Sequence, residues 1–299
     1  MGSNPATPTI QAPIDTMNLI TWNIQWCRGV DGRVDPARII EHARRLADFD
    51  VLCLQEVASN FGMLGGSEGE DQFRLLAELL PEFTAIPGVA VDIPDGKGGR
   101  RLFGNMVLSR YPVQRVFRHA MPYPPEPGRK TMPRMVIEAM VEAPFGLVRV
   151  MTTHFEYNSQ RQRLAAIEAI RRIQQEAALF EREDQQAVGD EGTFKWMQRP
   201  SAAILTADFN MRLDNPAFAR LTEPFEDGAP AFLNAWHGRY GDREHPHTVG
   251  LYDQVQWPEA HACDFIFVSE NLRDRIEAVT VDQVTDASDH QPILLTLSD

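Results

Sequence analysis

The sequence predicts an α+β fold in which helices and mixed β-sheets form separate layers. Short apolar runs that end in a polar residue are typical of buried strands, as in 202–207 before Asp208. Some of these runs occur in pairs around a short turn and predict antiparallel hairpins, whereas segments with helical spacing of apolar residues separate others. Hairpins mixed with helical crossovers favour a layered α+β sandwich over a purely parallel sheet.

The first part of the chain alternates strands and helices. A strand over 17–23 precedes a Gly- and Asp-rich loop. Asp35-Pro36 then begins a helix to about residue 47, because Asp is a favoured N-cap and Pro fits the first helical position. A buried strand over 51–56, a Gly-rich loop and a helix over 71–80 follow.

Hairpins and a long helix dominate the rest. Segments 83–91 and 102–109 flank the basic, Gly-rich turn 96–101, and 135–143 and 146–153 form a second pair. The remaining predictions are the longest helix from 159 to about 186, an irregular insertion over 188–200, turns and short helices over 214–253, and strands over 263–268, 276–284 and 292–297.

The composition is that of a folded globular protein. Of the 299 residues, 43% are hydrophobic and 24% are charged, which favours one domain over 17–299 after a disordered leader over 1–16. The leader lacks the basic start and apolar stretch of a signal peptide, and no apolar run approaches the roughly 20 residues that span a bilayer. The scattered Cys27, Cys53 and Cys263 predict neither a disulfide framework nor a zinc cluster, so we expect a cytoplasmic protein.

The charge distribution is uneven. The net charge of −13 disfavours a nucleic-acid partner, yet residues 97–134 hold nine Lys or Arg and one acid, Glu126. The basic residues are Lys97, Arg100, Arg101, Arg110, Arg115, Arg118, Arg129, Lys130 and Arg134. This basic island is either a solvated face or a surface that faces an anion, and both interpretations stay open.

Polar residues stand at the ends of several predicted strands. Asp208 and Asn210 lie two residues apart, so in an extended chain both side chains leave one face and can approach one bound atom. Alternatively, they close the strand as an Asx turn. Comparable positions are held by Asn23, Glu56, His154, Asp264, Asp289 and His290. Because sites are built from loops and strand ends on a rigid scaffold, we expect one shared cleft.

Seven short motifs occur in order over 18–297: Trp22-Asn23, Leu54-Gln55-Glu56-Val57, Gly104-Asn105-Met106-Val107-Leu108-Ser109, Thr153-His154, Ala207-Asp208-Phe209-Asn210, Asp264-Phe265-Ile266-Phe267 and Ser288-Asp289-His290. Together they resemble the endonuclease/exonuclease/phosphatase family. The resemblance implies a four-layer sandwich in which two mixed sheets face each other and helices cover the outside, with the active site at one sheet edge. It also implies hydrolysis of phosphodiesters or phosphomonoesters with a divalent cation, usually Mg²⁺, with Mn²⁺ as an alternative.

The resemblance implies a set of metal ligands. A hard cation prefers oxygen ligands, takes one or two carboxylates and keeps waters for the substrate phosphate to replace. Glu56 is the expected main ligand, with Asn23 beside it as a ligand or phosphate contact. Asp289 is a further candidate that acts through water.

The catalytic roles follow from the same resemblance. Asp208 is expected to orient and deprotonate the attacking water, and Asn210 to donate to a phosphate oxygen. Asp264 is expected to orient His290, which acts on the phosphate as a donor or base. We assign Asp264 to this role because adjacent side chains on a strand, such as those of Asp289 and His290, point to opposite faces.

Four further residues are candidates for phosphate contact. His154 resembles the second histidine of the family, which stabilises developing charge, although a lone histidine is more often structural. Asn105 matches a Gly-Asn motif that supports the phosphate or the loops around it. Arg134 and Arg163 are looser candidates, for which a solvated face is an equal alternative.

We therefore predict a metal-dependent phosphoesterase that acts on a small or lipid-like phosphoester. Gln25 stands where abasic-site nucleases of the family have an acid, and the net charge is acidic, although the basic island keeps a DNA or RNA nuclease as the alternative. A phosphate-binding module without catalysis is the alternative of another class. Specificity is expected in loops 58–70, 119–133, 187–200 and 225–260.

Other chemistries lack their signatures. Ser288-Asp289-His290 holds the residue types of a serine hydrolase, but consecutive residues cannot form the relay and no nucleophile elbow occurs. His245 and His247 have no second ligand pair at zinc-site spacing. The chain also lacks the phosphate-binding loop of nucleotide triphosphatases.

Overall fold

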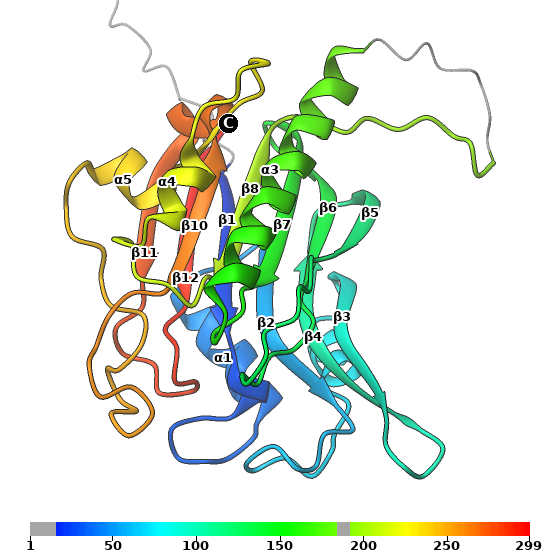
Figure 1. The fold of residues 1–299 in the computed structure, drawn as a ribbon, viewed down its shortest axis with the longest axis vertical. Helices are drawn as coiled ribbons and strands as arrows, with labels where there is room; N and C mark the ends of the chain where they lie inside the picture. Colours follow the sequence, from blue (N-terminus) through cyan, green and yellow to red (C-terminus); the bar gives the residue numbers. More distant parts are fainter. Residues whose placement is uncertain (1–15, 184–191) are drawn as a thin grey trace, which may run out of the picture.

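Two six-stranded sheets form the centre of the molecule in the computed structural model, which describes residues 16–183 and 192–299 (Figure 1). The first sheet has the order β11-β12-β1-β2-β4-β3 and the second β5-β6-β7-β8-β10-β9. The first contains β1 (Thr16–Asn23), β2 (Val51–Ser59), β3 (Thr84–Pro94), β4 (Arg100–Ser109), β11 (Ile276–Val281) and β12 (Ile293–Ser298). The second contains β5 (Val113–Ala120), β6 (Met135–Ala143), β7 (Gly146–His154), β8 (Ala203–Asp208), β9 (Phe232–Asn234) and β10 (Asp264–Ser269).

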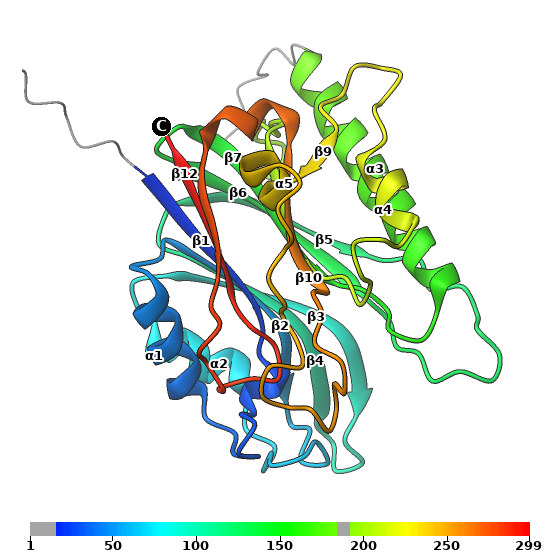
Figure 2. The ribbon, with the colours of Figure 1, turned by 90° about the vertical axis from the view of Figure 1, so that its left-hand side faces the viewer.

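Helices cover the outer faces of both sheets, which gives four layers. In Figure 2, α1 (Pro36–Leu46) and α2 (Gln72–Leu79) lie on the first sheet, and α3 (Gln160–Arg182) and α4 (Ala217–Thr222) lie on the second. The short α5 (Ala235–Tyr240) packs near β10 and β11. The predicted layered α/β sandwich with two facing mixed sheets is therefore confirmed.

Three apolar clusters join these layers. Between the sheets, Leu19 of β1 and Val150 of β7 belong to one cluster of buried side chains. On the outer faces, Ile40 of α1 packs with the first sheet, and Ile167 of α3 packs with the second. Strands buried on both faces appear in the sequence as continuous apolar runs, which explains why these strands could be predicted.

Local sequence signals place the helices. Asp35 caps α1, and its Oδ1 accepts hydrogen bonds from the backbone N–H groups of Ala37 at 3.0 Å and Arg38 at 3.1 Å. The Ser159 hydroxyl caps α3 by accepting from the N–H of Gln162 at 3.1 Å. These predicted helices are confirmed, and α3 ends at Arg182. No helix in the described part of the chain is both long and apolar enough to cross a membrane.

The strand predictions differ from the structure in detail. Both predicted hairpins are present, as β3 with β4 and β6 with β7. The strands β5 and β9 were not predicted, and the strand predicted over 276–284 ends at Val281. Thr16, assigned to the leader, already belongs to β1, and the predictions for residues 1–15 and 184–191 lie outside the described residues.

Two parallel strand pairs determine where the site lies. The pairing of β1 with β2 puts Asn23 opposite Gln55, and the pairing of β7 with β8 puts His154 opposite Asp208. The antiparallel β10 adds Asp264, also opposite Asp208. Strand ends from both sheets therefore bring polar residues to one edge of the sandwich.

A buried ion cluster lies elsewhere in the second sheet. Glu138 on β6 and Arg149 on β7 are both 0% exposed and form an ion pair at 3.2 Å. Arg199 donates to both oxygens of Glu138 at 2.9 Å, and His119 lies 2.6 Å away. Burial alone would raise the pKa of Glu138, but hydrogen bonds from His119 and Arg199 and the charge of Arg149 lower it to about 2.

Glu138→Gln is expected to lower the free energy of unfolding by about 3–5 kcal/mol at neutral pH, because it leaves the buried guanidinium of Arg149 without its charge partner. The folded-state pKa lies below the ordinary 4.5, so this contribution is present above that value and is lost as Glu138 protonates. The loss amounts to about 3 kcal/mol once the pH falls below both values.

Urea unfolding of the wild-type and variant proteins at about pH 7 measures the first effect. Repeating it at about pH 3 measures the larger part of the second, because this pH lies below the ordinary pKa of 4.5 but above the folded-state pKa of about 2. Glu142→Gln is the matched control, because Glu142 lies on the same strand and is exposed. If Glu138→Gln kept the wild-type stability and pH dependence, Glu138 would not stabilise the fold through these ion pairs.

Candidate functional site

A pocket of about 310 Å³ lies at the sheet edge where the polar strand ends meet. Its lining residues are Glu56, Met132, Arg134, His154, Tyr157, Asp208, Asn210, Gln256, Trp257 and His290. Six of these residues, namely Glu56, Arg134, His154, Asp208, Asn210 and His290, are predicted site residues. The expected shared cleft is therefore present.

Glu56 enters this pocket through an irregularity in β2. The register of β2 on β4 shifts between Leu54 and Val57, and Glu56 has a positive φ of 62°. A bulge of this kind re-aims a side chain at the cost of local backbone strain, and such strain is concentrated at functional sites. Burial, followed by the charge of Asp289, raises the pKa of Glu56.

Asn23 connects the two principal carboxylates. Its amide nitrogen donates to Glu56 Oε1 at 3.1 Å and to Asp208 Oδ2 at 2.9 Å. Its oxygen accepts from the backbone N–H of Gln25 at 3.1 Å. Asn23 thus holds the two acids together from the end of β1, and a ligand role for its oxygen requires the amide to rotate.

Asp208 and Asn210 form an Asx turn and also line the pocket. Asp208 Oδ1 accepts from the backbone N–H of Asn210 at 2.8 Å, and Asn210 has a positive φ of 50°. From the sequence, an Asx turn and a shared site were alternative interpretations of Asp208 and Asn210. In the structure the two residues do both. Burial, followed by the charge of Asp264, raises the pKa of Asp208 to about 7.

His154 is buried between the same groups. The Asn210 amide nitrogen donates to the backbone carbonyl of Phe155 at 3.0 Å and also lies 2.9 Å from His154 Nε2. Nε2 is therefore an acceptor, and it lies 3.4 Å from Asp208 Oδ2 and 3.9 Å from Glu56 Oε1. Because burial and the charge of Arg134 lower the pKa of His154 well below its ordinary value, the ring is neutral, and the Nε2 that accepts from Asn210 lies close to two carboxylates.

His290 has the opposite character. Its Nδ1 lies 2.9 Å from Asp264 Oδ2, which also accepts from the Thr248 hydroxyl at 2.6 Å, so the expected Asp-His pair is present. Burial alone would lower the pKa of His290, but the charges of Asp264, Asp289 and Asp208 raise it well above the ordinary value. His290 is therefore a buried cation.

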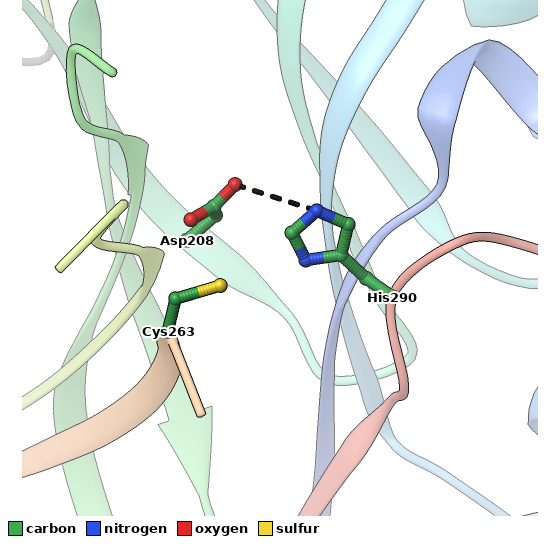
Figure 3. A group of neighbouring side chains, drawn as sticks. All are labelled: Asp208, Cys263 and His290. Atoms are coloured by element: carbon green, nitrogen blue, oxygen red, sulfur yellow. Dashed lines mark ion pairs between the residues drawn. The ribbon is translucent and has the colours of Figure 1, made fainter. Parts of the chain in front are cut away.

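The free nitrogen of this cation faces Asp208. His290 Nε2 lies 3.8 Å from Asp208 Oδ2, as Figure 3 shows, with the Cys263 side chain beside them. Burial raises the pKa of the Cys263 thiol well above its ordinary value, so the sulfur keeps its proton at neutral pH. The pairing leaves Nε2 available to donate to an anion in the pocket.

Asp289 lies behind the pocket wall. Its Oδ2 accepts from the Gln256 amide at 2.8 Å and from the Trp257 indole at 2.9 Å, and its charge acts on Glu56. It lies 4.0 Å from His290 Nε2. The structure thus places Asp289 near the expected metal ligand but holds its carboxylate with two loop side chains.

Arg134 is the cation on the opposite wall. It forms an ion pair with the buried Glu156 at 3.1 Å, and its Nη1 is buried without a hydrogen-bond partner. Asn105 lies behind it and donates to the Met135 carbonyl at 3.1 Å. Arg163 instead donates to the carbonyls of Glu156 and Tyr157 and to Gln160, so of the two arginine candidates the structure places only Arg134 at the pocket.

The basic island divides into separate parts. Arg134 lines the pocket, whereas Arg100 pairs with Asp92 on the β3–β4 hairpin, and Arg110 pairs with Asp48 before β2. These two pairs support the solvated-face interpretation for their arginines. Arg134, which lines the pocket, fits the other interpretation, in which a basic side chain faces an anion.

Two groups of side chains could hold a metal ion. The ligand atoms of Glu56, His154 and Asp208 lie within 4.8 Å of one another, as do those of Asp208, Cys263 and His290. The first group offers two carboxylates and an imidazole lone pair, a set of acceptors whose mutual repulsion a divalent cation would relieve. The second contains a protonated thiol and a cationic ring, so the first group fits a hard metal better.

Four residues that line the pocket were not predicted as site residues. Met132 lies in one loop where specificity was expected, and the consecutive residues Gln256 and Trp257 lie in another. Tyr157 follows the end of β7. Single aromatic and amide residues in loops carry no periodic or spacing signal. Long-range contacts alone bring them to the pocket.

Fold and site together define a layered α/β phosphoesterase. The model of the Endonuclease/Exonuclease/phosphatase family matches residues 20–290, and the chain belongs to this family. Enzymes of the family are hydrolases that act on phosphoester bonds. No curated protein matches the chain.

Several solved structures are similar in fold. An endonuclease/exonuclease/phosphatase from Beutenbergia cavernae DSM 12333 has 23% identity and a TM-score of 0.60, over 95% of this chain and 72% of that chain. The Bacteroides thetaiotaomicron VPI-5482 mannosyl-6-phosphatase has 17% identity and a TM-score of 0.62, over 93% and 98%. TDP2 from D. rerio, complexed with single strand DNA product, has 17% identity and a TM-score of 0.58, over 94% and 98%. At these identities the likeness shows the fold.

Proposed function

We propose that this chain is a divalent-metal-dependent phosphoesterase that hydrolyses a small phosphoester by attack of water. The observation that carries the proposal is the convergence of an acceptor group, Glu56, His154 and Asp208, with the cationic side chains of His290 and Arg134 on one pocket. The acceptors suit a metal and the cations suit a phosphate. A site for a neutral ligand would have no use for both.

Each residue has a role that follows from its contacts. Glu56, together with Asn23 and, through water, Asp289, would hold a metal such as Mg²⁺ or Mn²⁺, which when bound would neutralise phosphate charge. Asp208, with its raised pKa, orients the attacking water and takes its proton. His290, held by Asp264, donates to the phosphate as a cation.

The remaining side chains hold the anion and the pocket. Arg134 Nη1 is the proposed phosphate donor, and the Asn210 amide joins it by turning the N–H that it now gives to His154 toward the phosphate. Asn105 supports the segment around Arg134 and Met135. The neutral His154 ring would be an acceptor toward the metal once the Asn210 amide releases its Nε2 lone pair. The donor role expected for His154 from the family resemblance requires a hydrogen on Nε2, which the other neutral tautomer would provide.

A substrate panel tests this function. An aryl phosphomonoester, an aryl phosphodiester, a hexose phosphate, a phospholipid and single-stranded DNA are each incubated with Mg²⁺ or Mn²⁺, and with EDTA. The proposal expects EDTA-sensitive turnover of the small esters. Turnover of DNA alone would favour the nuclease alternative, for which the fold shared with TDP2 in its complex with single strand DNA product is the supporting observation. Phosphate binding without turnover of any ester would identify a binding module.

Arg134→Met is expected to lower kcat/KM by about 10–100-fold, because a charge-assisted hydrogen bond to phosphate contributes about 1.5–3 kcal/mol. The loss should be accompanied by weaker binding of inorganic phosphate, measured by calorimetry. Arg163→Lys is the control, because the Arg163 guanidinium donates hydrogen bonds to backbone carbonyls of the adjacent loop. Equal losses in both variants would show that Arg134 acts through the loop rather than on the anion.

A further inference from the structure

The pocket has a charged inner part and an uncharged outer part. The inner part holds the acceptor group and its neighbouring cations, described above. We call the four uncharged lining residues the outer part, because Tyr157 and Gln256 are exposed and Met132 and Trp257 are partly exposed. None of these four side chains carries a charge, so the part of a substrate beyond the phosphate meets apolar and amide surface.

Tyr157 and Trp257 form a right-angled corner in this outer part. Their ring centroids are 6.3 Å apart and their planes are inclined by 81°, which is an edge-to-face contact. The two rings touch each other, so a flat ligand cannot insert between them. A ligand ring can instead stack on one aromatic face and meet the edge of the other.

The two halves of the corner are held differently. The Trp257 indole donates to Asp289 at 2.9 Å, and the ring packs edge-to-face with His290 at a centroid distance of 5.6 Å. Trp257 is therefore fixed against the proposed catalytic groups. Tyr157 is 57% exposed and lies at the pocket.

Neither ring contributes to the folded core. Tyr157 and Trp257 are outside the four buried apolar clusters of the described chain. A large aromatic side chain that is exposed beside a concave polar site is the residue type that anchors ligand rings. The pocket volume of about 310 Å³ lies at the small end of ligand pockets and leaves room for a phosphate and little more than one ring.

We propose that this site selects phosphoesters in which a single uncharged ring, aryl or sugar, lies close to the ester oxygen and stacks in the corner of Tyr157 and Trp257. This proposal rests on the phosphoesterase function above. A polyanionic leaving group is not expected to bind, because none of the four residues of the outer part is a cation.

Binding of phosphonates tests the ring without any turnover. Phenylphosphonate and methylphosphonate differ by the ring and are not hydrolysed, and calorimetry with excess Mg²⁺ measures the affinity of each. Stacking on an aromatic face is expected to make phenylphosphonate bind about tenfold more tightly to the wild-type protein. That preference should disappear in Tyr157→Ala and persist in Tyr157→Phe. Equal affinities in the wild-type protein, or a persisting preference in Tyr157→Ala, would overturn the proposal.

Turnover then distinguishes the two ring sources. The ratio of kcat/KM for an aryl phosphate or a hexose 6-phosphate to that for glycerol phosphate is expected to fall about tenfold in Tyr157→Ala. A fall for only one ring type identifies the leaving group, and no fall for either contradicts the proposal. Phe194→Ala is the matched control, because Phe194 is 85% exposed and lies outside the pocket lining. If no ester is turned over while the phenylphosphonate preference holds, the phosphoesterase function fails and the ring-binding corner stands.

Discussion

Asp208→Asn is expected to lower kcat by about 10²–10⁴-fold, which is the contribution of a positioned general base. The amide keeps the shape of the side chain and one oxygen for the Asx turn with Asn210. It cannot take a proton from water. The fold should therefore survive while the chemical step is lost, and KM should change far less than kcat.

Steady-state kinetics on the best substrate of the panel, with circular dichroism to check folding, measures this loss. Asp242→Asn is the matched control, because Asp242 is exposed and lies outside the pocket. A folded Asp208→Asn protein with wild-type kcat would remove Asp208 from the proposed role. Activity would then have to rest on another base.

Glu56→Gln is expected to weaken metal binding and metal-dependent activity by more than about 100-fold. Loss of a residue that only supports a metal ligand costs about 10–100-fold, and Glu56 is proposed as a ligand itself. Glu56 is the carboxylate that the β2 bulge turns into the pocket, and burial raises its pKa. Without metal, loss of this partly buried acid relieves repulsion with Asp289, so the melting temperature of the metal-free variant should equal or exceed that of the wild type.

Thermal unfolding with and without Mg²⁺ or Mn²⁺ separates these effects, because a ligand that binds the folded state raises the melting temperature. The wild-type protein should gain stability with metal and Glu56→Gln should not. Glu68→Gln, an exposed acid in the following loop, should behave as the wild type does. A normal metal-induced rise in Glu56→Gln would exclude Glu56 as the main ligand.

Much of the scaffold could be predicted because local chemistry determines it. Strands such as β8 are buried on both faces and read as continuous apolar runs, and Asp35 and Ser159 are caps that act on residues beside them. The strands that were missed lack these signals. β5 lies at a sheet edge, has no fully buried residue and exposes Gln114, Arg118 and Ala120. β9 has only three residues.

The site could be predicted as a set of residues but not as a geometry. Polar residues at strand ends indicated Asn23, Asp208 and His290, because parallel neighbours bring strand ends to one edge. Nothing local indicates that β2 bulges at Glu56 or that the Asx turn and the site share Asp208. These features depend on contacts between residues far apart in the sequence.

The two aromatic residues of the outer part of the pocket could not be predicted either. Trp257 reaches the site through a hydrogen bond to Asp289, a residue on another loop, and Tyr157 meets Trp257 across the opening. Neither residue belongs to a motif. The proposed ring-binding corner therefore depends on tertiary contacts and could be recognised only in the structure.

The most direct test of metal-dependent hydrolysis at this site is a chelation and restoration experiment. The protein is treated with EDTA, freed of chelator and titrated with Mg²⁺ or Mn²⁺, and release of the aryl alcohol from an aryl phosphomonoester and an aryl phosphodiester is followed. We expect turnover that disappears with chelation, returns with saturable dependence on metal, and fails to return in Glu56→Gln. Turnover that persists without metal, or that is restored fully in Glu56→Gln, would contradict this expectation.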